Sequence, residues 1–349
     1  AQRRRSGDVG KEKKGQGTYI MSILKSASAL VVGAVMSIGA VATSASAADL
    51  LPVKAKAPVI GPSVPLDVHG YFDLTFATSR VTPGGLMIYP SRGYLSQPEV
   101  GLSLDLYKDP NGFINSISIF GGLWNEFWSS PPAGGRTWQE MDWWAGFTVG
   151  FARDWKFTAE SLNFVFPSGG SDLQNYYFIL SYDDSHLGWF PFAWNPTVKL
   201  FWTHHGGSAV VLGKTEDAYR FEVGVAPSWS MQKYWGVPLT FTVPTWVAVA
   251  PDSYYNRMDG TTNLCGATQT QVCGTNNVGL VSTGLQARYA LTGIVPNRLG
   301  NWYVKAGFQY YHINNDALLA SQVITGAASS FINAHKDVVV GNTGIGFTF

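Results

Sequence analysis

The chain has 349 residues, of which 46% are hydrophobic and 14% aromatic but only 13% charged, with a formal net charge of +1. Typical soluble domains carry about 25% charged residues, so this composition excludes an ordinary soluble surface. Apart from one N-terminal stretch there is no long apolar run of the kind found in helical membrane proteins, which favours a β-rich protein with one apolar and one polar face.

The N-terminal region predicts export. Residues 21–47 begin at Met21, pass through a short basic region with Lys25 and an apolar segment, and end in an A-x-A site at Ala45–Ala47. This arrangement is typical of a secretory signal peptide, and a single transmembrane anchor is the alternative. Residues 1–20 precede the plausible initiator Met21 and are interpreted as an upstream, non-native extension.

Removing residues 1–47 changes the charge balance. This segment holds seven of the 24 Lys and Arg and two of the 23 Asp and Glu, which leaves 17 basic against 21 acidic residues, a net charge of −4. A mildly acidic chain gives no support to a nucleic-acid partner. The following residues 48–67 are rich in Pro and Ala and predict a flexible or extended periplasmic leader.

From Val68 onward, apolar residues recur with a period of two. In the segment 218–226, for example, Tyr219, Phe221 and Val223 alternate with charged or small residues, as expected for strands with two unlike faces. Most of the predicted strands have 10–14 residues, which is long for a globular strand and right for crossing a bilayer at a tilt. The twelve predicted strands are 68–79, 97–106, 113–126, 139–153, 156–166, 174–183, 196–205, 218–228, 238–250, 278–291, 302–313 and 337–349.

The connections alternate between short turns and long loops, which is typical of outer-membrane barrels. A sheet that spans lipid must have no unpaired edge, so residues 68–349 are predicted to form an all-β, transmembrane, antiparallel up-and-down β-barrel of about twelve strands, with short periplasmic turns and long extracellular loops. The segment 184–195 is an exception, because it is long for a periplasmic turn; either the register is wrong there or an amphipathic segment lies on the membrane surface. Aromatic residues near strand ends, including Trp124, Trp155, Trp302 and Tyr303, are interpreted as interfacial girdles. A secreted β-sandwich or jelly roll with an apolar surface is the alternative fold.

The last residues, GNTGIGFTF, end the chain on Phe349. Together with the A-x-A site and the two-faced strands, this ending resembles alphaproteobacterial, porin-like outer-membrane β-barrel proteins. The segments 119–128 and 139–151 are more weakly similar to TorF-like putative porins. The resemblance implies a location in the Gram-negative outer membrane, contact with its lipid and lipopolysaccharide, and Phe349 as the signal for the barrel-assembly machinery. It leaves the oligomeric state open.

The strand parity predicts which ionisable side chains face the lumen. These candidates for setting selectivity are Asp73, Glu99, Asp105, Asp142, Lys156, Glu160, Lys199, Arg220, Glu222, Arg288 and Lys305. They favour a channel for passive diffusion of small hydrophilic solutes. The alternatives are a closed lumen crossed by paired charges, and a structural or adhesion-type barrel that acts through its outer loops.

Few residues are candidates for a disulfide, a metal site or catalysis. Cys265 and Cys273 are expected to form a disulfide after export, a metal site being the poorer alternative. His204, His205 and Ser208 are the one candidate for a lipid hydrolase, but no third residue at a recognisable spacing orients the histidine. The protein is therefore predicted not to be an enzyme, and since nucleotide-binding motifs are absent, no cofactor is expected.

Overall fold

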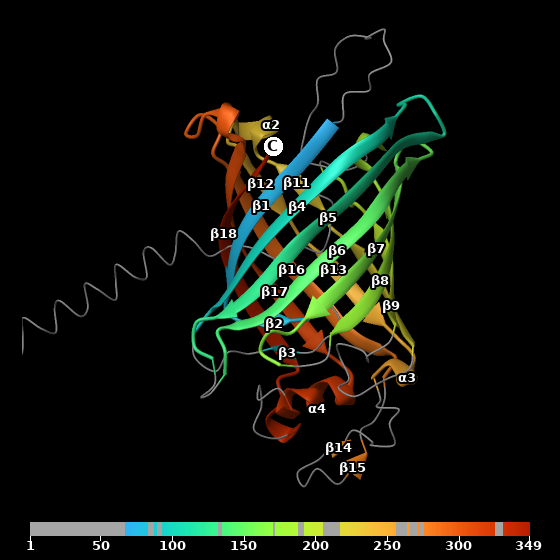
Figure 1. Cartoon of the computed structure of the whole chain (residues 1–349), viewed down its shortest axis with the longest axis vertical. Coiled ribbons are helices and arrows are strands. Elements are labelled where there is room, and N and C mark those ends of the chain that lie inside the picture. The colour runs from blue at the N-terminus through green and yellow to red at the C-terminus, as the bar shows by residue number, and fades with distance from the viewer. Residues whose placement is uncertain are drawn as a thin grey trace, which may run out of the picture.

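The structure is a computed structural model that describes residues 67–82, 87–88, 93–131, 135–169, 172–187, 192–204, 217–255, 264–265, 271–272, 276–324 and 331–349. Within these residues the chain forms a single closed antiparallel barrel (Figure 1). Its wall has twelve strands, two of them broken in the middle. The wall strands are β1 (Asp67–Ala77), β4 (Leu95–Lys108), β5 (Ile114–Trp128), β6 (Trp138–Phe151), β7 (Trp155–Val165), β8 (Leu173–Tyr182), β9 (Thr197–His204), β10 (Ala218–Val225) continued by β11 (Ser228–Ser230), β12 (Leu239–Thr242) continued by β13 (Thr245–Val249), β16 (Val278–Ala290), β17 (Asn301–Ile313) and β18 (Asp337–Thr348).

The barrel closes where its first and last strands meet. β18 pairs with β17 on one side and with β1 on the other, and every other wall strand pairs with its sequence neighbours. Beyond the last paired residues, the amides of Gly70 and Phe349 each donate a hydrogen bond to the other's carbonyl, at 3.1 and 3.0 Å. The predicted fold and strand number are confirmed, and each predicted strand coincides with a wall strand to within two residues at either end.

The two broken wall strands have a local cause. Pro227 follows β10, and Pro244 precedes β13, at positions where a ladder would need a backbone N–H that proline lacks. The two strands stay hydrogen-bonded across the break, because the amide of Val243 donates to the carbonyl of Pro227 at 2.9 Å. The sequence prediction of unbroken strands over 218–228 and 238–250 was wrong in this detail.

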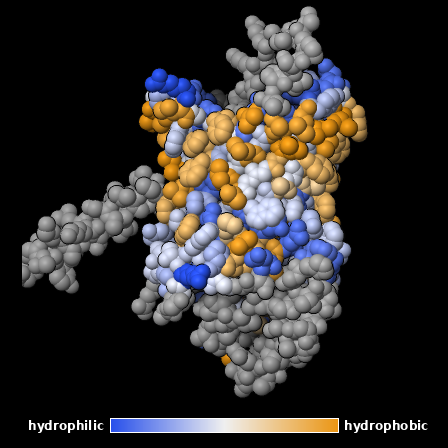
Figure 2. Space-filling model, in the orientation of Figure 1, coloured by the Kyte–Doolittle hydropathy of each residue, from blue (hydrophilic) through white to orange (hydrophobic). Residues whose placement is uncertain are grey.

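Alternate side chains separate the two faces of the wall. Along β4, Gln97 is buried while Val100 and Leu102 are exposed to the surroundings at 41% and 54%. Along β10, Arg220 and Glu222 are buried while Phe221 is 49% exposed. Figure 2 shows apolar side chains gathered on the outer wall. Exposed apolar rings and aliphatic chains on a closed sheet are the outer face expected of a barrel in lipid.

The two ends of the barrel differ, as the sequence predicts. Both chain ends of the barrel and the short turns lie together; the β6–β7 turn uses Ala152 and Arg153 at φ 45° and 73°, values typical of tight hairpins. The 3-10 turns Ser185–Leu187 (η2) and Asn297–Leu299 (η3) and the helix Gln232–Trp235 (α2) also belong to this end. The opposite end carries β2 (Arg80–Val81), β3 (Met87–Ile88), α3 (Asp252–Tyr255), β14 (Leu264–Cys265), β15 (Gln271–Val272), α4 (Asp316–Ile324) and η4 (Phe331–Asn333), as Figure 1 shows.

The long connection between β8 and β9 is held in place by hydrogen bonds. The Asp184 carboxylate accepts hydrogen bonds from the amides of Trp194 and Asn195 at 3.0 and 2.8 Å, and Ala193 bridges to Ser228. The strand register on both sides is as predicted, so the first of the two explanations for this segment, a wrong register, is excluded.

Folded loops cover the mouth at the long-loop end. Inward residues of the wall such as Leu95, Leu280 and Ile313 pack with Leu318 and Leu319 of α4 in one buried apolar cluster, which also takes in Met87 and Tyr255. We call this cluster the mouth cap. It is the main apolar core of the described residues, and it lies inside the wall because the outer face is exposed.

Several sequence predictions lie outside the described residues: the extension 1–20, the signal peptide 21–47, nearly all of the leader 48–67, Cys273, His205 and Ser208. For Cys265 only the backbone is described, in β14, so the disulfide stays a prediction. Across the part of the chain that the structure describes, no helix is long and apolar enough to cross a membrane.

Candidate functional site

The barrel lumen collects the ionisable side chains. All eleven predicted lumen residues have the inward parity of their strands, and the most deeply buried are Asp73, Asp142, Lys199, Arg220 and Glu222, each at most 8% exposed. Three buried clusters and their borders hold seven of them: Asp73, Glu99, Lys199, Arg220, Glu222, Arg288 and Lys305. Asp142 faces Trp124 of the first cluster across the β5–β6 ladder. Glu160 lies apart in the middle of β7, and Asp105 and Lys156 lie apart near the short-turn end of β4 and β7.

The first cluster centres on a residue that the sequence analysis placed in a loop. Arg80 of β2 reaches into the lumen and donates hydrogen bonds to Glu140 at 2.8 and 3.0 Å and to Glu126 at 3.1 Å. Its guanidinium stacks on Trp124 at 4.5 Å, and Gln97 donates to Glu126 at 2.9 Å. Burial works against the charge of Arg80, but the carboxylates of Glu140 and Glu126 outweigh it and raise its pKa above the ordinary value.

Sequence reasoning missed this cluster for two reasons. Glu140 has the same parity as Asp142 and could have been recognised, but Glu126 lies at a strand end beside a β-bulge that shifts the register. Arg80 gives no periodic signal, because β2 has only two residues. Trp124, interpreted as a girdle residue, instead faces Arg80 inside the barrel, and that interpretation was wrong.

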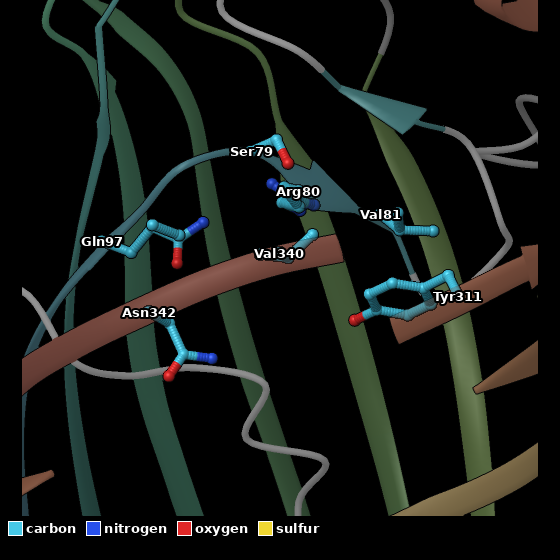
Figure 3. A pocket seen from close by; sticks show the side chains of 8 residues that line it. Ser79, Arg80, Val81, Gln97, Tyr311, Val340 and Asn342 are labelled. Atoms are coloured by element: carbon cyan, nitrogen blue, oxygen red, sulfur yellow. The ribbon is translucent and has the colours of Figure 1, made fainter. Parts of the chain in front are cut away.

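A small cavity lies beside Arg80 (Figure 3). It is lined by Arg80, Gln97, Tyr311 and Asn342 together with small and apolar residues of β1, β2 and β18, and has a volume of about 20 Å³. Both amide atoms of Asn342 and the Oε1 atom of Gln97 are buried here without a hydrogen-bond partner among the described residues. The polar lining and the volume suit one water molecule.

The second cluster lies on neighbouring strands of the opposite arc of the wall. Lys199 of β9 forms an ion pair of 2.9 Å with Glu222 of β10, which directly faces it in the ladder. Arg220 lies 3.7 Å from the other carboxylate oxygen of Glu222, and its guanidinium stacks on Phe201 at 3.9 Å. Opposite charges that face each other across a ladder stabilise the strand pair.

The third cluster crosses β18. Lys305 of β17 forms an ion pair of 2.8 Å with Asp73 of β1, and the Tyr303 hydroxyl donates a hydrogen bond of 2.6 Å to the same carboxylate. Both reach over β18, where Gly346 lies between Tyr303 and Asp73 in the register. A Cβ at Gly346 would meet the Tyr303 hydroxyl at 2.5 Å, so the absence of a side chain there lets the two neighbours touch.

Two more of the predicted residues border this cluster. Arg288 of β16 stacks on the Tyr303 ring at 3.5 Å, and the Tyr71 hydroxyl donates to the Glu99 carboxylate. Tyr303 was interpreted from the sequence as a girdle residue, but it is 6% exposed and belongs to the lumen. That interpretation was wrong because its parity, rather than its position near a strand end, decides its face.

The charges are divided between two arcs of the wall. Inward acids are on β1, β4, β5, β6 and β7, where the inward lysines of the described wall residues are Lys156 and, beyond the β-bulge of β4, Lys108, both near the short-turn end. Inward bases follow on β9, β10, β16 and β17, where Glu222 is the one inward acid of that arc in the described residues. The lumen therefore has an acidic and a basic side.

One group near the short-turn end has the composition of a cation site. Asp67 and Asp105 face each other across β1 and β4, with His69 Nε2 at 3.4 and 3.5 Å from their carboxylates. Lys108 lies 3.9 and 3.7 Å from the same two carboxylates and already supplies a positive charge there. Two carboxylates and an imidazole could hold a divalent ion if Lys108 swung away.

Part of the inner wall is apolar. Leu162 and Phe164 of β7, Tyr177 and Ile179 of β8 and Phe201 of β9 form a buried cluster on the inward face. We call it the lumen patch. It adjoins Arg220, because Phe201 faces Arg220 in the ladder. The sequence analysis had considered only the charged inward positions.

The histidine considered for catalysis has a carboxylate partner. His204 Nδ1 lies 3.1 Å from Asp217 Oδ1, while Trp202 Nε1 donates to the other oxygen of Asp217 at 3.2 Å. The sequence expectation that no third residue orients the histidine was therefore wrong. The spacing hid it, because Asp217 comes thirteen residues later, directly before β10.

No family model and no curated protein matches the chain. Among solved structures it is similar to the NanC porin (10% identity, 81% of this chain and 98% of that chain, TM-score 0.36). It is also similar to the translocator domain of the autotransporter NalP from Neisseria meningitidis (12%, 81% and 88%, TM-score 0.33) and to Salmonella typhi OmpF in complex with daunomycin (9%, 81% and 97%, TM-score 0.33). At these identities and TM-scores the likeness carries no functional argument. The architecture is that of an outer-membrane β-barrel.

Proposed function

We propose that the protein is an outer-membrane channel for passive diffusion of small hydrophilic solutes in a Gram-negative bacterium. The observation that carries this proposal is the division of lumen charges into an acidic arc from β1 to β7 and a basic arc from β9 to β17. Opposed charges in a narrow lumen set up a local field that orients polar solutes and selects among ions.

Conductance tests the proposal directly. Purified protein added to a planar lipid bilayer should produce stepwise conductance in KCl. In a salt gradient, Lys305→Met should shift the reversal potential toward cation selectivity, since it removes a base that lies 2.8 Å from Asp73. The exposed Lys336→Met is the control and should leave the reversal potential unchanged. Absence of conductance steps at every voltage would refute the channel.

The mouth cap favours a second candidate. The apolar packing of α4 against inward residues of the wall covers the long-loop end, which suits a structural or adhesion-type barrel that presents its outer loops to a partner. The same bilayer recording separates the two functions. A barrel that never conducts, even after variants that loosen the cap such as Leu318→Ala, would support the second candidate.

The proposal assigns no catalysis to the His204–Asp217 pair. Purified protein is expected not to hydrolyse phospholipid in mixed micelles. Hydrolysis by the wild type that disappears in His204→Ala would contradict this. The export signal at 21–47 belongs to the same proposal, and a band in the outer-membrane fraction whose gel mobility shifts on heating would support it.

A further inference from the structure

Arg220 is a buried cation whose hydrogen-bond donors find no acceptor in the part of the chain that the structure describes. It is 1% exposed, and its Nε, Nη1 and Nη2 atoms have no hydrogen-bond partner among the described residues. The nearest carboxylate, Glu222, lies 3.7 Å away and already pairs with Lys199 at 2.9 Å. Buried donors without acceptors destabilise a fold, so such a group calls for a partner.

The side chains packed against Arg220 on its β9 side are aromatic and apolar. Phe201 lies under the guanidinium with 3.9 Å between its ring centroid and Cζ, and Tyr177 packs edge-on against Phe201 at 4.3 Å between ring centroids. The rest of the lumen patch continues this surface across β8 to β7. Stacking on a ring covers the face of a guanidinium and leaves its donors in the plane to bind another group.

The local charge favours an anion. Lys199 and Arg220 face one carboxylate on their own strands, that of Glu222. Glu160 of β7 is three strands from Arg220 along the ladder and interacts with Lys199, so Arg220 is the less compensated of the two bases. A carboxylate is the anion whose two oxygens match the in-plane donors of arginine.

We propose that Arg220 and the lumen patch bind a small carboxylate with a flat apolar body, such as an aromatic monocarboxylate. Its carboxylate accepts two hydrogen bonds from the Arg220 guanidinium, and its ring lies against the patch. This names a solute class for the proposed channel and rests on it for the solute's passage, whereas binding itself needs no conduction.

Access to Arg220 involves the outer loops. α3 packs against β10, and its Tyr255 shares an apolar cluster with Ala218, two residues before Arg220. Because Arg220 is enclosed, binding needs its surroundings to open, and we infer that α3, which packs against β10, is the element that moves. Binding should therefore make Tyr255 more accessible to solvent, a change that hydrogen exchange of the α3 segment can follow.

The test is a calorimetric titration of the full chain, in detergent micelles, with benzoate. Benzoate should bind, and benzamide, which has the same shape without the charge, should bind at least tenfold more weakly. Arg220→Gln should lower benzoate affinity by a similar factor, and Arg220→Lys should recover only part of it because lysine lacks the planar fork. The exposed Arg298→Gln, in η3 at the short-turn end, is the control.

A stability measurement keeps the test independent of folding defects. Arg220→Met leaves Glu222 paired with Lys199, so the urea midpoint should stay the same or rise. A fall in the midpoint would instead assign Arg220 a structural role. The matched variant Lys199→Met removes the closest partner of Glu222 and should lower the midpoint.

Three results would overturn the proposal. These are equal binding of benzoate and benzamide, unchanged benzoate affinity in Arg220→Gln, and an equal loss in Arg288→Gln, which would show a general effect of lumen charge. If the wild type conducts but does not bind benzoate, the proposed carboxylate site is refuted and the channel is not. Benzoate binding without conductance refutes the channel alone.

Discussion

Arg80 and Glu140 join a loop to the barrel wall through two hydrogen bonds, at 2.8 and 3.0 Å, inside the mouth of the lumen. Arg80 belongs to the loop that follows β1, and Glu140 to β6. The pair therefore fixes the position of β2 inside the mouth, and Glu126 adds a third hydrogen bond to the same guanidinium.

Removal of Arg80 should destabilise the barrel and loosen its mouth. Arg80→Met leaves the buried carboxylates of Glu126 and Glu140 without their cation, and we expect a loss of about 3–5 kcal/mol in the free energy of unfolding. Urea unfolding followed by tryptophan fluorescence measures it. The control is Arg153→Met, because that side chain is 76% exposed and should change stability by less than about 0.5 kcal/mol. Equal effects of the two variants would contradict the prediction.

A side chain at Gly346 should disrupt the contact across β18. Gly346→Val places a branched chain where the Tyr303 hydroxyl and the Phe72 carbonyl lie within 2.7 Å of a Cβ. We expect loss of the Tyr303–Asp73 hydrogen bond and a lower unfolding midpoint. The matched control is Gly341→Val, where the nearest atom to a Cβ is the Thr78 methyl at 3.6 Å. A smaller midpoint change for Gly346 than for Gly341 would be inconsistent with this account.

The turn after β8 should lose stability in acid. The Asp183 carboxylate accepts a hydrogen bond from the Ser185 amide at 2.9 Å. Burial alone would raise the pKa of Asp183, but the Ser185 hydroxyl and amide, helped by Lys156 and His186, hold it below the ordinary value. A lowered folded-state pKa contributes stability above the unfolded pKa of about 3.9, and this contribution is lost as the pH falls through the folded pKa.

The measurement compares the wild type with Asp183→Ala over a pH series. The wild type should be the more stable near neutral pH, and the difference should shrink below about pH 4. Asp184→Ala serves as a comparison, since Asp184 holds the same connection through Trp194 and Asn195. A stability difference for Asp183→Ala that grows on acidification would have the wrong sign.

Deletion of Phe349 should impair assembly in cells more than the stability of refolded protein. We propose that the terminal ring is the signal for the barrel-assembly machinery. In the fold, the ring lies over Gly70, so that a Cβ at Gly70 would overlap it, while the ring itself is 54% exposed. Such a half-exposed contact should add only modestly to the stability of the folded barrel. Outer-membrane yield and urea midpoint of the deletion should be compared, and equal proportional losses would contradict the separation of roles.

The sequence predicted the wall well because strand parity is a strong local signal. A buried Arg220 next to an exposed Phe221 follows from alternation alone, and Gly344 and Gly346 of the last strand lie on the inward face. Parity does not reveal long-range partners. Arg80 meets Glu126 and Glu140 only because the loop folds back into the lumen, and Asp217 meets His204 only through the β9–β10 register. The positions of the loops depend on packing contacts such as those of the mouth cap. These contacts leave no periodic pattern in the sequence, so they could not be predicted from it.

The closure of β18 on β1 has a kinetic consequence. The Gly341 amide donates to Thr78 Oγ1 across a separation of 263 residues, and this seam can form only when the last strand has been synthesised. Until then the edge of β1 that will face β18 is unpaired and can join other chains. The entropy cost of so large a loop closure is paid in one late step, so folding should be slow and limited by sealing of the seam. A nascent chain of this kind therefore needs the free edge of its first strand shielded until the last strand reaches it.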